Sequence, residues 1–134
     1  MFFKLKPSKP KILIIDDDPS LQRQLQFRLD KRDHFSVYLA SDGETGLKLM
    51  NKVAPDLVIL DWMLPGIHGP EILRLMKAKA KTRDIPVLML TGRDKIGDIE
   101  DAFALGADEY LTKPFSLQAL SNKARRALAS QTAD

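Results

Sequence analysis

The sequence contains no cysteine and no apolar run long enough to cross a membrane. Disulfide bonds and thiolate metal sites are therefore excluded, and a reducing compartment is compatible with the composition. The first residues, 1–7, include two lysines and lack the extended apolar segment of a secretion signal. We therefore expect a soluble, cytoplasmic protein that makes no contact with a membrane.

Neither sign of charge dominates the chain. Lysine and arginine number 21 against 18 acidic residues, which gives a formal net charge of +3. The basic residues form two clusters. The first is explained by a solvated N-terminal tail, and the second by the end of a helix, where the helix dipole favours cations. No aromatic residues interleave with the second cluster, so direct nucleic-acid binding is not expected. The clusters are Lys4, Lys6, Lys9 and Lys11 at the start, and Arg74, Lys77, Lys79, Lys81 and Arg83 further on.

Length and hydropathy predict one domain. The 134 residues, 44% of them hydrophobic, suffice for one sizeable core and are too few for two ordinary domains. We expect a flexible basic arm over 1–10, the domain over 11–130, and a C-terminal tail or the start of a linker over 131–134. Strands are predicted at 11–16, 35–40, 56–60, 85–90 and 107–111, and helices at 19–31, 43–53, 69–80, 95–105 and 116–129.

The predicted strands are of the kind that is buried on both faces. Residues 12–15 and 57–60 are unbroken runs of Ile, Leu and Val, which is typical of a parallel sheet covered on both sides. Strictly alternating strands and helices with short loops give that arrangement. The predicted fold class is therefore α/β, a doubly wound five-stranded parallel sheet with helices on both faces. Asp18, Pro19 and Ser116 are suited to begin the first and last helices.

Polar groups follow four of the predicted strands, at the edge where parallel strands end. Asp16 and Asp17 come after the first strand, Asp61 after the third, Thr91 after the fourth and Lys113 after the fifth. The crevice outside this edge is the usual ligand site of open α/β sheets. Clustered carboxylates repel one another unless a cation lies among them. With no cysteine and only two histidines, all-oxygen ligation of Mg²⁺ is favoured over zinc or copper.

This grouping suggests phosphoryl transfer. With Mg²⁺ bound, a carboxylate oxygen of Asp61 could attack a phosphoryl donor and form an aspartyl phosphate. Lys113 would neutralise charge on the phosphoryl oxygens, and Thr91 would offer its hydroxyl to one of them. Each residue alone has a simpler interpretation: a helix-capping turn for 16–18, a loop hydroxyl for Thr91, and a half-buried strand aromatic for Tyr110. Their joint occurrence favours the functional interpretation.

Four motifs with their spacing carry a resemblance to a known family. They are IIDDD at 14–18, LDWMLPG at 60–66, LTG at 90–92 and YLTKPF at 110–115. Over about residues 11–128 the sequence resembles the receiver domain of two-component response regulators. The resemblance implies the flavodoxin-like, CheY-like fold with strand order 2-1-3-4-5.

The resemblance also implies a role for the residues that match these motifs. Asp61 would accept the phosphoryl group. Asp16, Asp17 and Asp61 would hold Mg²⁺ directly or through water, with the backbone carbonyl of Met63 as a further ligand. Lys113 would contact a phosphoryl oxygen.

The third and fourth motifs also imply a conformational switch. Thr91 and Tyr110 would form a pair in which the hydroxyl moves toward the phosphoryl group and the aromatic ring swings inward. The peptide bond between Lys113 and Pro114 would be cis, as in the family.

By the same resemblance, the expected function is a phosphorylation-activated signalling switch and not an enzyme with a separate substrate. The donor would be a sensor histidine kinase or a phosphotransfer protein, and the signal would pass to an unknown downstream protein or a fused output domain. The readout surface would be the fourth helix, the fifth strand and the fifth helix. Its candidate contacts are Lys95, Ile96, Ile99, Phe103 and Tyr110.

Dimerisation through that same surface is not favoured. Ile99 and Ala119 stand where further charged partners are expected. The charged residues that could supply two pairs are Asp98, Asp108, Lys123 and Arg125.

Three other functions remain as alternatives. A phosphate-ester hydrolase could use an Asp-x-Asp pair, which residues 16–18 contain, but no segment is long enough to form a substrate cap. A flavodoxin-like electron carrier would need a phosphate cradle where this chain has acids. An interaction module that is never phosphorylated, including one that binds nucleic acid, would not need the complete set of phosphorylation residues.

Overall fold

The computed structural model describes residues 9–92 and 96–132, so most of the expected N-terminal arm and residues 133–134 lie outside it. Within those ranges, none of the helices combines the length and apolarity that crossing a membrane requires. Strands and helices alternate along the chain as predicted. They are β1 (Lys11–Ile15), α1 (Pro19–Gln26), a π-helical turn (Phe27–Arg32), β2 (Ser36–Ala40), α2 (Gly43–Val53), β3 (Leu57–Asp61), α3 (Gly69–Lys77), β4 (Val87–Thr91), α4 (Ile96–Ala104), β5 (Glu109–Thr112) and α5 (Leu117–Thr132).

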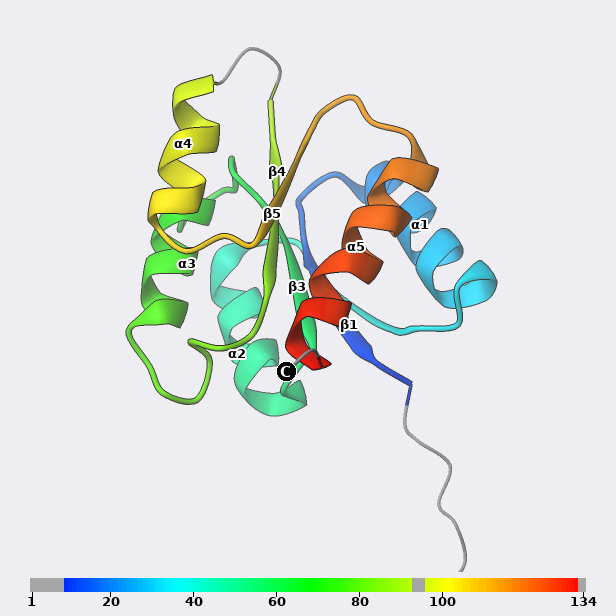
Figure 1. The fold of residues 1–134 in the computed structure, drawn as a ribbon, viewed down its shortest axis with the longest axis horizontal. Helices are drawn as coiled ribbons and strands as arrows, with labels where there is room; N and C mark the ends of the chain where they lie inside the picture. The colour runs from blue at the N-terminus through cyan, green and yellow to red at the C-terminus, as the bar shows by residue number, and fades with distance from the viewer. Residues whose placement is uncertain (1–8, 93–95, 133–134) are drawn as a thin grey trace, which may run out of the picture.

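The five strands form one parallel sheet in the order β2-β1-β3-β4-β5. Helices α1 and α5 cover one face, and α2, α3 and α4 cover the other (Figure 1). The predicted fold class, strand order and placement of helices on both faces are therefore confirmed.

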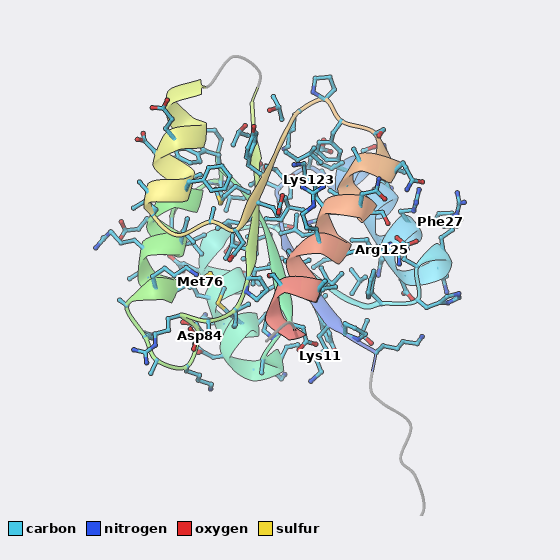
Figure 2. All side chains as sticks on the ribbon, in the orientation of Figure 1. Lys11, Phe27, Met76, Asp84, Lys123 and Arg125 are labelled. Carbon is cyan, nitrogen blue, oxygen red and sulfur yellow. The ribbon has the colours of Figure 1, made fainter. Side chains whose placement is uncertain are left out.

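Both faces of the central strands are buried, as their unbroken apolar runs predicted. Alternate residues of β1 point to opposite sides: Ile12 and Ile14 belong to the hydrophobic cluster under α1 and α5, and Leu13 and Ile15 to the cluster under α2, α3 and α4. Figure 2 shows side chains on both layers; Met76 of α3 is buried and Phe27 is 61% exposed. The core therefore fixes the sheet firmly and leaves the strand ends free for polar groups.

The helix starts that the sequence indicated are confirmed. The side chain of Asp18 accepts hydrogen bonds from the backbone amides of Ser20 and Leu21, at 2.9 and 3.3 Å, and Pro19 occupies the first turn. The hydroxyl oxygen of Ser116 accepts a hydrogen bond from the amide of Ala119 at 3.0 Å. These caps satisfy amides that have no partner inside the helix.

The prediction of one continuous helix over 19–31 was wrong for its second half, which is not α-helical. The α-helix ends at Gln26, and the chain continues as a π-helical turn to Arg32. The buried Arg28 donates a hydrogen bond to Gln118 of α5 at 3.0 Å and another to Asp33 at 3.3 Å. Arg28 and Gln118 are 90 positions apart, so local periodicity carries no sign of this contact.

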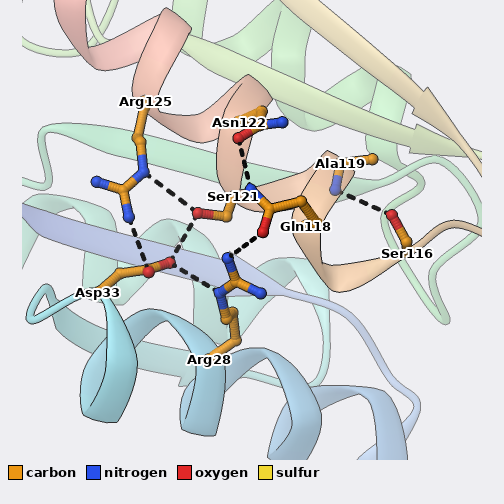
Figure 3. Close-up of polar contacts among 8 residues, drawn as sticks. All are labelled: Arg28, Asp33, Ser116, Gln118, Ala119, Ser121, Asn122 and Arg125. Atoms are coloured by element: carbon orange, nitrogen blue, oxygen red, sulfur yellow. Dashed lines mark hydrogen bonds and ion pairs between the residues drawn. The ribbon is translucent and has the colours of Figure 1, made fainter.

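Asp33 joins the end of this turn to α5, as Figure 3 shows. Its carboxylate, 6% exposed, accepts hydrogen bonds from Ser121 and Arg125, both at 2.8 Å, besides the one from Arg28. A buried carboxylate with three donors is well satisfied. The network therefore fixes the α1 layer against α5.

Other boundaries differ from the predictions by a few residues. The third helix ends at Lys77 and not at residue 80, and the fifth strand covers Glu109–Thr112 and not 107–111. Residues 107 and 108 instead lie between a turn at 105–106 and the strand, and Asp108 accepts a hydrogen bond from the amide of Val87 at 2.8 Å.

Candidate functional site

The C-terminal edge of the sheet brings the predicted residues together. Asp61 and Thr91 are the last residues of β3 and β4, and Asp16 directly follows β1. Backbone hydrogen bonds continue past the strand ends, from the amide of Trp62 to the carbonyl of Leu90 at 2.9 Å and from the amide of Lys113 to that of Thr91 at 2.8 Å. The position of each side chain is therefore set by the strand that carries it.

Asp16, Asp17 and Asp61 form one carboxylate cluster. One oxygen from each lies within 4.8 Å of the others. Asp16 is fully buried and Asp61 is 6% exposed, whereas Asp17 is exposed to solvent. Two acids of the cluster, Asp16 and Asp61, are therefore shielded from solvent, and Asp17 is accessible to it.

Lys113 contacts both buried acids of this cluster. Its Nζ lies 3.0 Å from Oδ2 of Asp16 and 3.3 Å from Oδ2 of Asp61. The other oxygen of Asp16, Oδ1, accepts a hydrogen bond from the amide of Asp18 at 2.9 Å. The bond between Lys113 and Pro114 is cis, as the resemblance implied. In the part of the chain that the structure describes, Lys113 is therefore the one cation that forms ion pairs within this cluster of three carboxylates.

The pKa values reflect this imbalance of charge. Burial, together with the neighbouring charge of Asp16, raises the pKa of Asp61 to about 6, although Lys113 opposes the shift. Burial alone would lower the pKa of Lys113, but the carboxylates of Asp16 and Asp61 outweigh it and raise that pKa. Lys113 thus stays charged, and negative charge remains incompletely compensated.

The donor set fits a hard divalent cation. All candidate ligand atoms are oxygens, they are closely grouped, and they carry more negative charge than Lys113 balances. Oxygen ligands with room for water on one side are what Mg²⁺ prefers. Met63 follows two residues after Asp61 and is 64% exposed, and a backbone hydrogen bond from Met63 lowers the pKa of Asp61, although burial and Asp16 outweigh it. The role of its carbonyl as a ligand stays a prediction.

Gly69 supports the site in a way that sequence reasoning missed. A Cβ at this position would collide with the carbonyl oxygen of Asp61 and lie 2.9 Å from Cα of Trp62. The amide of Gly69 donates a hydrogen bond to the carbonyl of Trp62 at 3.0 Å. The first residue of α3 thus lies directly against the backbone that carries Asp61. The sequence signal that could have indicated this close approach is a glycine between His68 and Pro70 at the start of a predicted helix.

The predicted switch residues lie on β4 and β5. Thr91 is fully buried, and its hydroxyl donates to the carbonyl of Gly92 at 3.4 Å. Tyr110 is half-buried, and its ring contacts Phe103 of α4 and Lys123 of α5. Of the other expected readout contacts, Lys95 lies outside the described residues, as do the side chains of Ile96 and Ile99.

Three charged residues considered for dimerisation bind within the chain. Arg125 donates to Asp33, and Asp108 accepts from the amide of Val87, both at 2.8 Å. The Nζ of Lys123 lies 3.5 Å from Oε1 of Glu109. The side chain of Asp98 lies outside the described residues. Absence of dimerisation through this surface stays a prediction.

An open groove of about 480 Å³ lies beside the carboxylate cluster. It runs between the start of α1 and the loop after β5, and Lys113 lines it. A partner that enters this groove would meet the lysine that contacts Asp61. The other residues that line it are Asp18, Leu21, Gln24, Gly92, Pro114 and Phe115.

Comparisons with known proteins agree with this geometry. The sequence profile described as "Response regulator receiver domain" matches residues 12–125. The chain is 41% identical over 106 residues to the phosphate regulon transcriptional regulatory protein PhoB of Klebsiella pneumoniae, covering 79% of this chain and 46% of PhoB. It is 40% identical over 119 residues to the DNA-binding dual master transcriptional regulator RpaA of Synechocystis sp., covering 89% and 49%.

Solved structures show the same fold. The response regulator receiver domain protein of Clostridium thermocellum has a TM-score of 0.84 and 33% identity, covering 92% of this chain and 97% of that one. The chemotaxis response regulator CheY4 of Vibrio cholerae has a TM-score of 0.84 and 27% identity, covering 90% and 99%.

The chain spans about half the length of the regulators PhoB and RpaA. Receiver domains act as signalling switches and not as classical enzymes, and they typically use Mg²⁺ in an acidic pocket. The profile match, the relatives and the fold agree: this chain belongs to the receiver domains of two-component response regulators.

Proposed function

We propose that this domain is a switch that accepts a phosphoryl group on Asp61 from a histidine kinase or phosphotransfer protein. One observation carries the proposal: three carboxylates have oxygens within 4.8 Å of one another, and Lys113 contacts the two buried ones. Carboxylates this close repel one another unless a cation lies among them, and such arrangements are typical of binding and catalytic sites. Asp16, Asp17, Asp61 and the carbonyl of Met63 would hold Mg²⁺.

The transfer itself needs an ionised Asp61. One carboxylate oxygen attacks the phosphorus, the P–N bond of a phosphohistidine breaks, and the released imidazole takes up a proton from water. Mg²⁺ would neutralise charge on the carboxylates and on the phosphoryl oxygens. The ammonium of Lys113, which lies 3.3 Å from Oδ2 of Asp61, would interact with a phosphoryl oxygen there. Thr91 would donate its hydroxyl to another.

The open groove next to Lys113 is the approach that we propose for the donor. It is lined by α1 and by the loop after β5, and it holds both apolar and polar side chains. A protein that carries phosphohistidine could place its imidazole there while it contacts α1. Both a kinase and a phosphotransfer protein would satisfy this geometry.

The signal would leave through Thr91 and Tyr110. The hydroxyl would move toward the phosphoryl group, the ring would swing inward, and the surface of α4, β5 and α5 would change. Only contacts that differ between the two conformations can shift their populations. The recipient is a downstream protein or an output domain; RpaA is named a DNA-binding regulator, so transcription is the output that we propose for a longer protein of this kind.

The test is intact mass after incubation with Mg²⁺ and acetyl phosphate. We expect a single phosphoryl adduct on the wild type and none on Asp61→Asn. The matched control is Asp84→Asn, because Asp84 is an exposed acid between α3 and β4, at the opposite edge of the sheet (Figure 2). An equal adduct on Asp61→Asn, or none on folded wild type, contradicts the proposal.

A further inference from the structure

The two basic clusters of the sequence meet at the C-terminal end of α2. The Nζ of Lys11, the first residue of β1, donates to the carbonyl of Val53 at 3.2 Å. The Nζ of Lys81, in the turn after α3, donates to the carbonyl of Asn51, also at 3.2 Å. All strands of the sheet are parallel, so the edge where β1 begins is opposite to the edge that carries the carboxylate cluster (Figure 2).

Two more lysines belong to the same surface. Lys52 lies between Asn51 and Val53 in the last turn of α2, and its side chain is exposed. Lys79 is exposed too, and it lines a hollow of about 60 Å³ between α2 and α3 together with Asn51. We call this set the lysine cluster; its members are Lys11, Lys52, Lys79 and Lys81.

The positive charge of the lysine cluster is not balanced. In the part of the chain that the structure describes, no carboxylate forms an ion pair with any of its members. The carboxylate of Asp56 accepts from the backbone amide of Lys11 at 2.7 Å, so it offsets at most one of the four charges. The end of α2 attracts cations as well, but its partial charge amounts to only about −0.5.

The surface around the cluster is polar. Of the described residues, Phe27, Met63 and Phe103 are the exposed large apolar side chains, and none of them belongs to α2, to α3 or to the turn after α3. Interfaces between proteins are enriched in aromatic side chains and depleted in lysine. Contacts to the phosphates of nucleic acids are made largely by lysine and arginine. The composition of this surface therefore fits a phosphate backbone better than an acidic protein.

We propose that the lysine cluster binds the phosphate backbone of double-stranded DNA without reading its sequence. An ammonium group has three donors, so Lys11 and Lys81 can keep their carbonyl contacts and also donate to a phosphate oxygen. Release of counterions from the DNA would supply the affinity. This inference goes beyond the proposed function and does not depend on phosphorylation of Asp61, which lies at the other edge of the sheet.

The test is fluorescence anisotropy of a labelled duplex of mixed sequence, titrated with the protein in EDTA at several NaCl concentrations. For four phosphate contacts we expect a Kd on the order of 10⁻⁵ M at about 50 mM NaCl, and a slope of log K against log[NaCl] of about −3 to −4. The variant with Lys52→Gln, Lys79→Gln and Lys81→Gln should bind at least about tenfold more weakly, with a slope of about −1.

A matched control removes the same amount of charge elsewhere. Arg23→Gln, Lys31→Gln and Arg32→Gln together remove three exposed cations from α1 and the turn that follows it. We expect this variant to bind within about threefold of the wild type, with the same slope. Lys52→Gln with Lys79→Gln leaves both carbonyl contacts at the end of α2 in place, and its slope should be about −2. Thermal unfolding checks that each variant is folded.

Each outcome supports or overturns the proposal. Weaker binding and a smaller slope in the lysine-cluster variants, but not in the control, support it. Equal losses in both triple variants overturn it, because only the net charge then matters. Tighter binding to vesicles of phosphatidylserine and phosphatidylcholine, or to poly-glutamate, than to the duplex overturns it in favour of a membrane or an acidic protein. A folded wild type that does not bind the duplex overturns it as well and leaves phosphorylation of Asp61 unaffected.

Discussion

Replacing Asp61 by asparagine is expected to make the metal-free protein more stable. Burial and the charge of Asp16 raise the pKa of Asp61 from 3.8 to about 6, so the folded state disfavours the ionised carboxylate. A tenfold change in proton affinity corresponds to about 1.4 kcal/mol, which sets an upper limit of about 3 kcal/mol for this cost. Asparagine cannot ionise but keeps the shape and an oxygen that can accept from Lys113. We therefore expect an increase of about 1 to 3 kcal/mol in the free energy of unfolding at pH 8.

The pH dependence gives this prediction its sign. Because the folded pKa exceeds the unfolded one, the folded state binds the proton more tightly between about pH 4 and pH 6. The cost of ionisation is therefore complete above pH 6 and disappears as the pH falls to 3.8. The advantage of Asp61→Asn over the wild type should shrink in the same window. Mg²⁺ should reduce it as well, because a ligand at 100 times its Kd adds about 2.7 kcal/mol to the wild type.

The assay is urea unfolding in EDTA at several pH values from 5 to 8, repeated with Mg²⁺ at pH 8. Asp84→Asn serves as the control, since Asp84 is exposed and outside the carboxylate cluster; its difference from the wild type should stay within about 0.5 kcal/mol. If Asp61→Asn is less stable than the wild type in EDTA at pH 8, or if its advantage is the same at pH 5, the reasoning is refuted.

Three further predictions concern residues around the site and in the core. Gly69→Ala should lower the free energy of unfolding by about 1–3 kcal/mol or more, because a methyl group there overlaps the backbone. Gly66→Ala is the control: φ at Gly66 is +73° and the space around it is open, so this variant should lose only about 1 kcal/mol. Equal shifts of the two variants in thermal unfolding would contradict this prediction. Asp17→Asn should weaken Mg²⁺ binding about tenfold by calorimetry, since one carboxylate of the cluster is lost; an unchanged Kd would remove Asp17 from the metal site. Thr82→Val should cost about 1 kcal/mol, because the buried hydroxyl donates to the carbonyl of Met76 at 2.7 Å, and Thr82→Ser should lose less if the hydrogen bond is what matters.

The sheet and the position of the acids could be predicted because both depend on local patterns. The unbroken apolar runs at 12–15 and 57–60 required burial on both faces, and a parallel sheet then placed Asp16 and Asp61 at one edge. Asp18 and Ser116 could be assigned as caps because side-chain capping involves residues only two or three positions apart. Patterns of this kind need no knowledge of distant contacts.

The parts that could not be predicted depend on residues far apart in the chain. The π-helical turn after α1 accompanies the contact between Arg28 and Gln118, across 90 positions. Likewise, the ring contacts of Tyr110 and the approach of Gly69 to the backbone of Asp61 arise only when helices lie against the sheet. Hydrophobic periodicity records which face of a helix is buried, but not which polar groups meet there.

Helix α5, which covers one face of the sheet together with α1, is the last element of the domain. Leu120, Ala124 and Ala127 of α5 are almost completely buried against that face, and Ser121 and Arg125 supply two of the donors to Asp33. During synthesis these side chains emerge after every strand has been made. A ribosome-bound chain that stops short of α5 would carry the whole acidic cluster but leave the part of that face that α5 covers open to water or to a chaperone. We therefore expect the domain to be able to receive a signal only after its final helix has been translated.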